Sequence, residues 1–143
     1  MIAYSAGFMF FEDEVLLITK ARPSWQAGLL NGVGGKVEDG ELHVTAMVRE
    51  FREETGVDTA AADWTEFAEL LGGRNARGEP TAKIVLYCAR AAVRPKARSM
   101  TDEPVAWYLA KNLPSNVIGQ LRWQVPLALE VLSGARCHVR AHV

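Results

Sequence analysis

The sequence predicts a layered domain of the α/β or α+β class, in which a mixed sheet carries helices on its faces. Strand-like apolar stretches alternate with two segments of helical spacing, and turn-forming residues separate them. Hydrophobic residues make up 49% and charged residues 23% of the 143-residue chain, as in ordinary globular proteins. A chain of this length buries a sizeable core without disulfides or metals, so we expect a single domain over residues 1–143.

The first predicted element is a β-hairpin over Met1–Lys20. This stretch is apolar except for Glu12 and Asp13 near its middle, where a tight turn is expected, and Val15–Ile18 is the apolar run of its second strand. Ala21–Gly35 follows as a predicted loop, because its proline and glycines permit turns and close approach of the backbone.

A helix is predicted over Leu42–Thr55. Val44, Val48 and Phe51 recur at helical spacing, and Gly56 stands where a helix often ends in a left-handed residue. The sequence therefore places one amphipathic helix directly after the glycine-rich loop.

The second half of the chain predicts more strands and a second helix. Trp64–Gly72 and Thr81–Ala89 have strand character and are joined by a polar turn over 73–80. Val105–Leu109 is a shorter strand, and Leu121–Leu132 is an amphipathic helix in which Pro126 predicts a kink or a late start.

The charge balance and the cysteines exclude several classes of protein. Sixteen Lys and Arg against seventeen Asp and Glu give a net charge of -1, which offers no general attraction to duplex nucleic acid or to acidic membranes. The longest uncharged stretch, Pro23–Gly35, is too short and too rich in glycine to span a bilayer. With only Cys88 and Cys137, no disulfide framework is indicated, and a reducing cytoplasm is expected. Cys137, His138 and His142 are assigned no role and are expected in a solvated tail.

Three glutamates of the first predicted helix are the strongest candidates for a functional site. Glu50, Glu53 and Glu54 share one helix face at positions i, i+3 and i+4. Like charges at these spacings repel by about 0.2–0.5 kcal/mol per pair, and they oppose the helix dipole near the C-terminal end. A divalent cation such as Mg²⁺ reverses both effects, so the cluster predicts a metal site. The alternative is a solvated face with an ordinary Arg49–Glu53 ion pair.

The preceding segment Asn31–Lys36 is rich in glycine and favours phosphate binding. Its backbone can approach an anion closely, and Lys36 can reach a phosphate oxygen. Determinants for a metal and for a phosphate are therefore adjacent in the sequence.

These residues resemble the signature of the Nudix hydrolases. That signature is a glycine, five residues, a glutamate, seven residues, and then Arg-Glu-U-x-Glu-Glu-x-Gly-U, where U is a bulky apolar residue. The chain matches every fixed position from Gly35 to Val57, with Phe51 where an aliphatic residue is usual.

The resemblance implies the Nudix α/β/α sandwich, with a mixed sheet between helices, and hydrolysis of a nucleoside diphosphate linked to another group. The cofactor would be Mg²⁺ or Mn²⁺. By position, Glu50, Glu53 and Glu54, joined by the carbonyl of Gly34, would bind the metal. The remaining implied roles are Arg49 as the residue that orients the carboxylates, Glu41 as its partner, Lys36 as a phosphate contact, and Glu54 or Glu103 as the general base.

Leu30–Val37 is similar to the corresponding segment of MutT-like enzymes that hydrolyse oxidised purine nucleoside triphosphates. That similarity implies base contacts by Asn31 and a pocket lined by Trp25, whose indole can stack on a base. The acidic pair that reads the oxidised base is absent from Gly119–Trp123, where Gln120 could read a base edge instead.

The expected function is hydrolysis of a nucleoside triphosphate, or of a modified form such as an oxidised purine nucleotide, to the monophosphate and pyrophosphate. One alternative is a pyrophosphatase of ADP-ribose or another nucleoside diphosphate conjugate, and another is a catalytically silent nucleotide-binding domain. The expected partners are a nucleotide and, as an open alternative, a second copy in a homodimer, but neither duplex nucleic acid nor a membrane.

Overall fold

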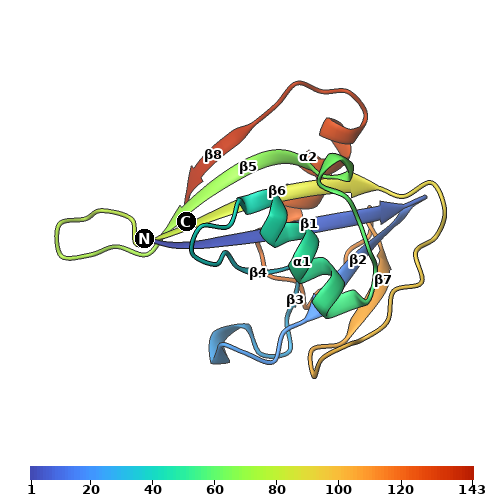
Figure 1. The fold of residues 1–143 in the computed structure, drawn as a ribbon, viewed down its shortest axis with the longest axis horizontal. Helices are drawn as coiled ribbons and strands as arrows, with labels where there is room; N and C mark the ends of the chain where they lie inside the picture. The colour runs from blue at the N-terminus through green and yellow to red at the C-terminus, as the bar shows by residue number, and fades with distance from the viewer.

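A mixed sheet of eight strands forms the centre of the molecule (Figure 1). The computed structural model describes the whole chain, Met1–Val143. Its elements are β1 (Ile2–Phe11), β2 (Glu14–Thr19), the 3-10 turn η1 (Ser24–Gln26), β3 (Leu30–Asn31), β4 (Val33–Lys36), α1 (His43–Thr55), η2 (Ala61–Asp63), β5 (Thr65–Gly72), β6 (Ala82–Arg90), β7 (Val105–Leu109), α2 (Leu121–Leu132) and β8 (Val139–His142).

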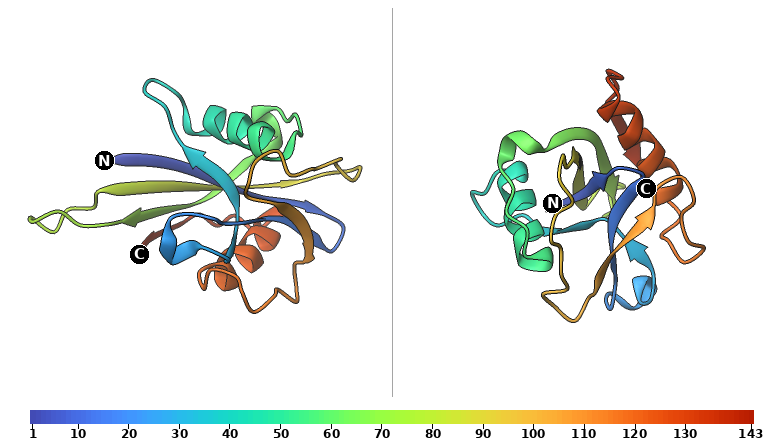
Figure 2. Two further views of the ribbon diagram at one scale, coloured as in Figure 1. Left: turned by 90° about the horizontal axis from the view of Figure 1, so that it is seen from below. Right: turned by 90° about the vertical axis from the view of Figure 1, so that its right-hand side faces the viewer.

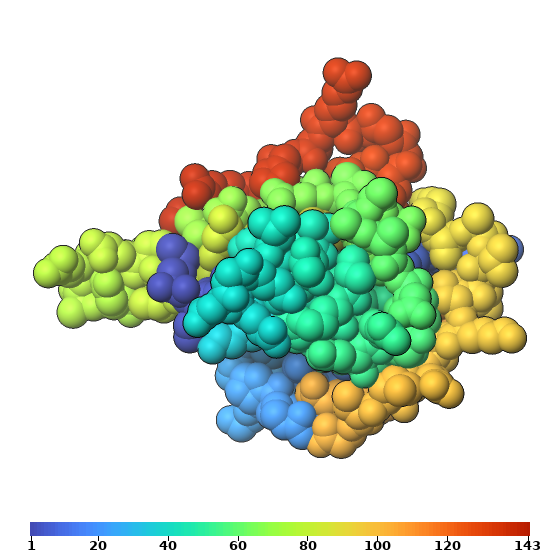
Figure 3. Space-filling model, in the orientation of Figure 1, coloured from blue at the N-terminus to red at the C-terminus, as the bar shows by residue number.

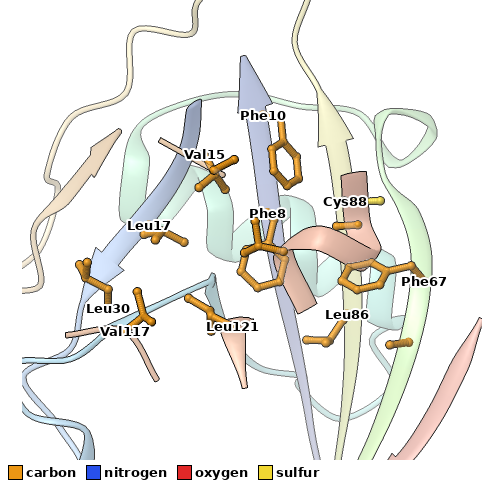
Figure 4. Packing of buried hydrophobic residues seen from close by; sticks show 14 of the residues in the cluster. Phe8, Phe10, Val15, Leu17, Leu30, Phe67, Leu86, Cys88, Val117 and Leu121 are labelled. Atoms are coloured by element: carbon orange, nitrogen blue, oxygen red, sulfur yellow. The ribbon is translucent and has the colours of Figure 1, made fainter. Parts of the chain in front are cut away.

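The two α-helices lie on opposite faces of this sheet, as Figure 2 shows. This arrangement confirms the expected α/β/α sandwich. Beneath α2, Phe8 and Phe67 of β1 and β5 pack with Leu121 in the larger core, which Figure 4 shows in detail. Beneath α1, Phe51 packs edge-on against Trp64 with 5.1 Å between ring centroids. Neither helix has the length and apolar character needed to span a bilayer.

Strand β1 organises the sheet. One of its edges pairs in parallel with β6 from Ile2↔Ala82 to Phe10↔Arg90. Its other edge is shared, because the first half pairs with β4 and the last residues pair with β2. The predicted hairpin is therefore confirmed, and the divergence of β2 from β1 leaves room for β4 beside the first half of β1.

The glycine-rich segment is partly strand, so the prediction of a loop over Ala21–Gly35 is wrong for β3 and β4. The glycines serve close pairing of two strands. A Cβ atom at Gly34 would lie only 2.0 Å from the carbonyl oxygen of Ser5 on β1. Glycine alone allows this approach, and a strand of glycines gives no alternation of polar and apolar residues from which it could be predicted.

Helix α1 and the β5–β6 pair agree with the sequence. Helix α1 ends at Thr55, and Gly56 adopts the left-handed conformation with φ 74°. Strands β5 and β6 pair antiparallel, and their connection over 73–80 projects from the body of the molecule (Figure 3).

The C-terminal part contains two corrections. Helix α2 begins at Leu121 and contains Pro126, so a late start is wrong. Cys137, His138 and His142 are exposed, as expected, but Val139–His142 forms a strand that was not predicted, β8, which pairs in parallel with β5. Its backbone pairs with β5 from Ala68↔Val139 to Leu71↔His142, and exposed side chains add contacts, since His138 Nε2 lies 2.7 Å from Glu66 Oε2 and Arg140 Nη2 donates to Glu69 Oε1 at 3.2 Å.

Candidate active site

Arg49 holds the carboxylates of the glutamate-rich motif together. Its Nε and Nη2 donate to the two oxygens of Glu41 at 2.9 and 2.8 Å. Its Nη1 donates to Glu50 Oε1 at 2.9 Å and to Glu53 Oε2 at 3.4 Å, and Nη2 also donates to the carbonyl of Lys36. Hydrogen bonding from Arg49 lowers the pKa of Glu41 to about 2. The Arg49 guanidinium therefore links β4, the following loop and helix α1.

Burial partly desolvates the carboxylates of Glu50 and Glu54. Burial raises the pKa of Glu50, and hydrogen bonding from Arg49 opposes that effect. Burial and then the charge of Glu50 raise the pKa of Glu54 to about 7, against the opposing influence of Lys20 and of the Gly34 backbone. Glu54 Oε2 is buried and has no hydrogen-bond partner. A buried acceptor without a partner costs free energy, and a cation or a proton at this place would relieve that cost.

Glu53 differs from its two neighbours because its side chain is 56% exposed and contacts only Arg49. The three predicted metal ligands therefore lie along one face of α1 without forming a closed cluster. No group of three or more His, Cys, Asp or Glu side chains is already arranged to hold a metal ion.

The donors of this region nevertheless suit a hard divalent cation. Glu54 offers a buried oxygen without a partner, and Glu50 offers a second desolvated carboxylate. The Glu50 carboxylate packs directly against Gly35, where a Cβ would lie 2.4 Å from Glu50 Cδ, so only glycine allows the carboxylate this close to β4. Carboxylate oxygens are ligands that Mg²⁺ and Mn²⁺ prefer, so the residues fit such an ion.

A pocket of about 590 Å³ reaches the same glycines from the α2 side of the sheet. Gly34 and Gly35 line it, and apolar residues such as Leu70, Leu86 and Leu121 form part of its wall. None of the residues that line it is an aspartate or a glutamate. The pocket thus leads from a partly apolar interior without acidic side chains to the glycines, of which Gly35 borders the Glu50 carboxylate.

Two pairs of amide side chains face into this pocket. Asn31 Nδ2 donates to Gln26 Oε1 at 3.2 Å, and Asn31 Oδ1 accepts from the backbone N–H of Gly32 at 2.8 Å. On α2, Gln124 Nε2 donates to Gln120 Oε1 at 3.3 Å. Asn31 and Gln120, both expected at the substrate, therefore line one pocket.

Trp25 and Lys36 lie differently with respect to the pocket. Trp25 lines it from η1 but is 68% exposed, so its indole stands at the rim. Lys36 is not among the lining residues, and its side chain is exposed at the end of β4. The cation that lines the pocket is Lys20, at the end of β2.

Glu103 is buried and carries two partners. Its Oε1 accepts from Lys20 Nζ at 3.1 Å, and its Oε2 accepts from the backbone N–H of Ala21 at 2.6 Å. Burial would raise the pKa of Glu103, but these donors lower it below its usual value. Arg22 also pairs with Asp102. Glu103 therefore ties the loop before β7 to the chain that leads into η1, and it is not a solvated loop acid.

Sequence reasoning missed Lys20 and Gln124. Lys20 sits in an ordinary position at the end of a strand, and no motif marks it. Gln124 could have been noticed because it follows Gln120 by four residues and so shares its helix face.

Comparisons with known proteins agree with this architecture. The NUDIX domain model matches residues 1–123. The CTP pyrophosphohydrolase of Escherichia coli (strain K12) is 38% identical over 64 residues, which are 45% of this chain and 47% of that protein. The match thus spans about half the length of this curated relative.

Two solved structures share the fold. The MutT NUDIX hydrolase from Burkholderia pseudomallei superposes with a TM-score of 0.71 at 24% identity, covering 88% of this chain and 96% of its own. The NUDIX hydrolase from Nitrosomonas europaea superposes with a TM-score of 0.76 at 14% identity, covering 99% of this chain and 78% of its own. Because the family model covers most of the chain and the fold agrees, the chain belongs to the Nudix domain family.

Proposed function

We propose that this chain is a divalent-metal-dependent pyrophosphohydrolase. Its substrate is a nucleoside triphosphate or a base-modified form of one, including an oxidised purine nucleotide, and its products are the nucleoside monophosphate and pyrophosphate. Nudix hydrolases act on nucleotide substrates and generally use divalent metals. The similarity to a CTP pyrophosphohydrolase over 64 residues supports a triphosphate substrate.

One observation carries this proposal. The pocket is lined by Gly34 and Gly35, and Gly35 packs directly against the Glu50 carboxylate. A nucleoside bound in the pocket would therefore extend its phosphates past the two glycines toward the acidic face of α1. Lys20 supports this direction, because it lines the pocket and its charge also acts on Glu54.

The proposed metal ligands are Glu50, Glu53 and Glu54 with the carbonyl of Gly34, and either Mg²⁺ or Mn²⁺ would suit them. When bound, a divalent cation supplies positive charge to the phosphate oxygens and makes water more acidic. Arg49 keeps Glu50 in position and Glu41 keeps Arg49 in position. Lys36 stays a predicted phosphate contact.

Of the two candidate bases, the contacts favour Glu54. A general base needs an oxygen that is free to accept a proton. Glu54 Oε2 has no partner, so this carboxylate can bind the metal through one oxygen and take up a proton on the other, whereas both oxygens of Glu103 accept hydrogen bonds. We therefore assign proton uptake to Glu54, and we assign to Glu103 the positioning of Lys20.

A panel of nucleotides tests the proposal. Purified protein is incubated with Mg²⁺ or Mn²⁺ and the common and oxidised nucleoside triphosphates, ADP-ribose and other nucleoside diphosphate conjugates, and the products are separated by chromatography. Release of monophosphate and pyrophosphate from a triphosphate is the expected result. Hydrolysis of ADP-ribose but of no triphosphate would overturn the proposed substrate. Metal-independent nucleotide binding without hydrolysis would favour a catalytically silent domain.

Glu53→Gln is the sharpest variant for the site itself. Because Glu53 is more than half exposed and has one long contact, its replacement should leave the fold intact. We expect kcat to fall roughly 100-fold or more. Asp58→Asn removes another exposed acid close to α1 and serves as a control that keeps full activity.

A further inference from the structure

Gln124 is buried in a way that packing alone does not explain. Its residue is 3% exposed, and its neighbours on α2 include the buried Leu121 and Val125. An amide can make up to four hydrogen bonds, and the side chain of Gln124 makes one, to Gln120 Oε1. Burial of an amide costs free energy that a leucine of similar size would not incur. The polarity of Gln124 therefore serves its contact with Gln120.

Helix geometry fixes this contact. Gln120 stands at the start of α2, and the backbone N–H of Gln124 donates to the Gln120 carbonyl at 3.0 Å. The two side chains thus lie one turn apart on the same face, where positions i and i+4 meet. The bond between their amides removes rotational freedom from Gln120, which would otherwise be a flexible side chain at the wall of the pocket.

The pocket offers neutral groups to a ligand at this place. No Asp or Glu side chain lines it, and its lining includes the second amide pair, Asn31 and Gln26. An amide held in one orientation presents a donor and an acceptor side by side. This is the complement of a nucleobase edge on which a donor and an acceptor adjoin.

We propose that Gln124 is a specificity-determining positioning residue that acts through Gln120. It aligns the Gln120 amide with the edge of the bound base, so that the pocket discriminates among bases by neutral hydrogen bonds. This inference rests on the proposed nucleotide function for its ligand, but it does not depend on turnover.

Binding of nucleoside monophosphates tests the proposal without turnover. Calorimetry gives the affinities of wild type and Gln124→Leu for AMP, GMP, CMP and UMP. We expect the ratio of the affinities for the best-bound and the worst-bound monophosphate to fall roughly 5- to 10-fold in the variant, since an aligned hydrogen bond is lost. Gln124→Met is a second variant with the same expectation, should Leu disturb folding. Glu130→Gln, an exposed change on the same helix, should leave the ratio unchanged.

A double-mutant cycle separates alignment from packing. If Gln124 acts through Gln120, Gln124→Leu will change base selectivity little in a Gln120→Ala background. Additive effects of the two changes would overturn the proposal, as would equal affinity of the wild type for all four bases. A wild type that binds with base preference but hydrolyses nothing would refute the proposed function and leave this inference standing. Turnover with a base preference that Gln124→Leu preserves would refute only the inference.

Discussion

Arg49 shows how single residues shape this site. Its guanidinium is one rigid fork of donors, and it contacts Glu41, Glu50 and Glu53 at once. A lysine could supply the charge but not the bidentate geometry toward Glu41. The two carboxylates therefore differ, because both oxygens of Glu41 accept hydrogen bonds from Arg49 while Glu54 keeps a buried oxygen without a partner.

The pairing of Glu41 predicts an acid-dependent contribution to stability. The Arg49 hydrogen bond lowers the folded-state pKa of Glu41 from 4.5 to about 2. The contribution is therefore fully present above pH 4.5 and is lost as the pH falls through 2. Glu41→Gln should lower the free energy of unfolding by about 1–3 kcal/mol at pH 7, and this deficit should shrink toward pH 2. Urea unfolding across pH 2–7 measures it, and a deficit independent of pH would contradict it.

In the protein without metal, Glu54 predicts a pH dependence of stability opposite to that of Glu41. Its folded-state pKa is raised to about 7 by burial and by Glu50. Its stabilising effect is present below pH 4.5 and is lost as the pH rises through 7, because the ionised form is then buried. Glu54→Gln should therefore unfold at higher urea than wild type at pH 8 with EDTA, and not at pH 4. Glu53→Gln, which is exposed, should show no such gain.

At the scale of elements, the sequence predicted best where side-chain periodicity was strong. Helix α1, the β5–β6 pair and β7 agree with prediction because their apolar residues repeat at helical or strand spacing. Strand β4 was missed because glycine carries no such pattern, and β8 was missed because its partner strand β5, with which Arg140 also makes a side-chain contact, is far away in the chain.

The residues of the candidate site likewise fall into those that the sequence predicted and those that it did not. The Arg49–Glu41 pair was implied by the resemblance to the Nudix signature, and the structure brings these residues together. Lys20 could not be predicted, because which segments enclose the pocket depends on contacts between distant parts of the chain, whereas the only signal for Gln124 was its spacing of four residues from Gln120. The contacts of Glu103 were not predictable for the same reason, since its partners Lys20 and Ala21 are remote in sequence.

Strand β4 yields a prediction about backbone pairing. Gly34→Ala places a Cβ against backbone atoms of Ser5 and Ala6, which cannot move as a flexible side chain can. The β1–β4 pairing must shift, at a cost of about 1–3 kcal/mol or more in the free energy of unfolding. Gly119→Ala is the matched control, since a Cβ there meets nothing within 4 Å. Equal melting temperatures for the two variants would contradict the close approach.

At the scale of the whole molecule, segments far apart in the sequence meet around the candidate site. Glu103 ties the loop before β7 to the chain entering η1, and the backbone N–H groups of Arg98 and Met100 in the same loop donate to the Thr55 and Glu54 carbonyls at the end of α1. A ligand that bridges α1 and the glycines of β4 therefore acts on the global fold.

A divalent metal should consequently raise the stability of the entire domain. A metal that binds only the folded state adds about 2.7 kcal/mol at 100 times its Kd. For a domain of this size, that corresponds to a rise of roughly 5–10 °C in Tm. The double variant Glu50→Gln/Glu54→Gln should lose the rise, because it removes both desolvated carboxylates, whereas Asp58→Asn should retain it. Thermal unfolding with Mg²⁺, with Mn²⁺ and with EDTA measures this. An equal rise in the double variant would mean that the metal binds elsewhere, because the loss of its proposed ligands would then have no effect.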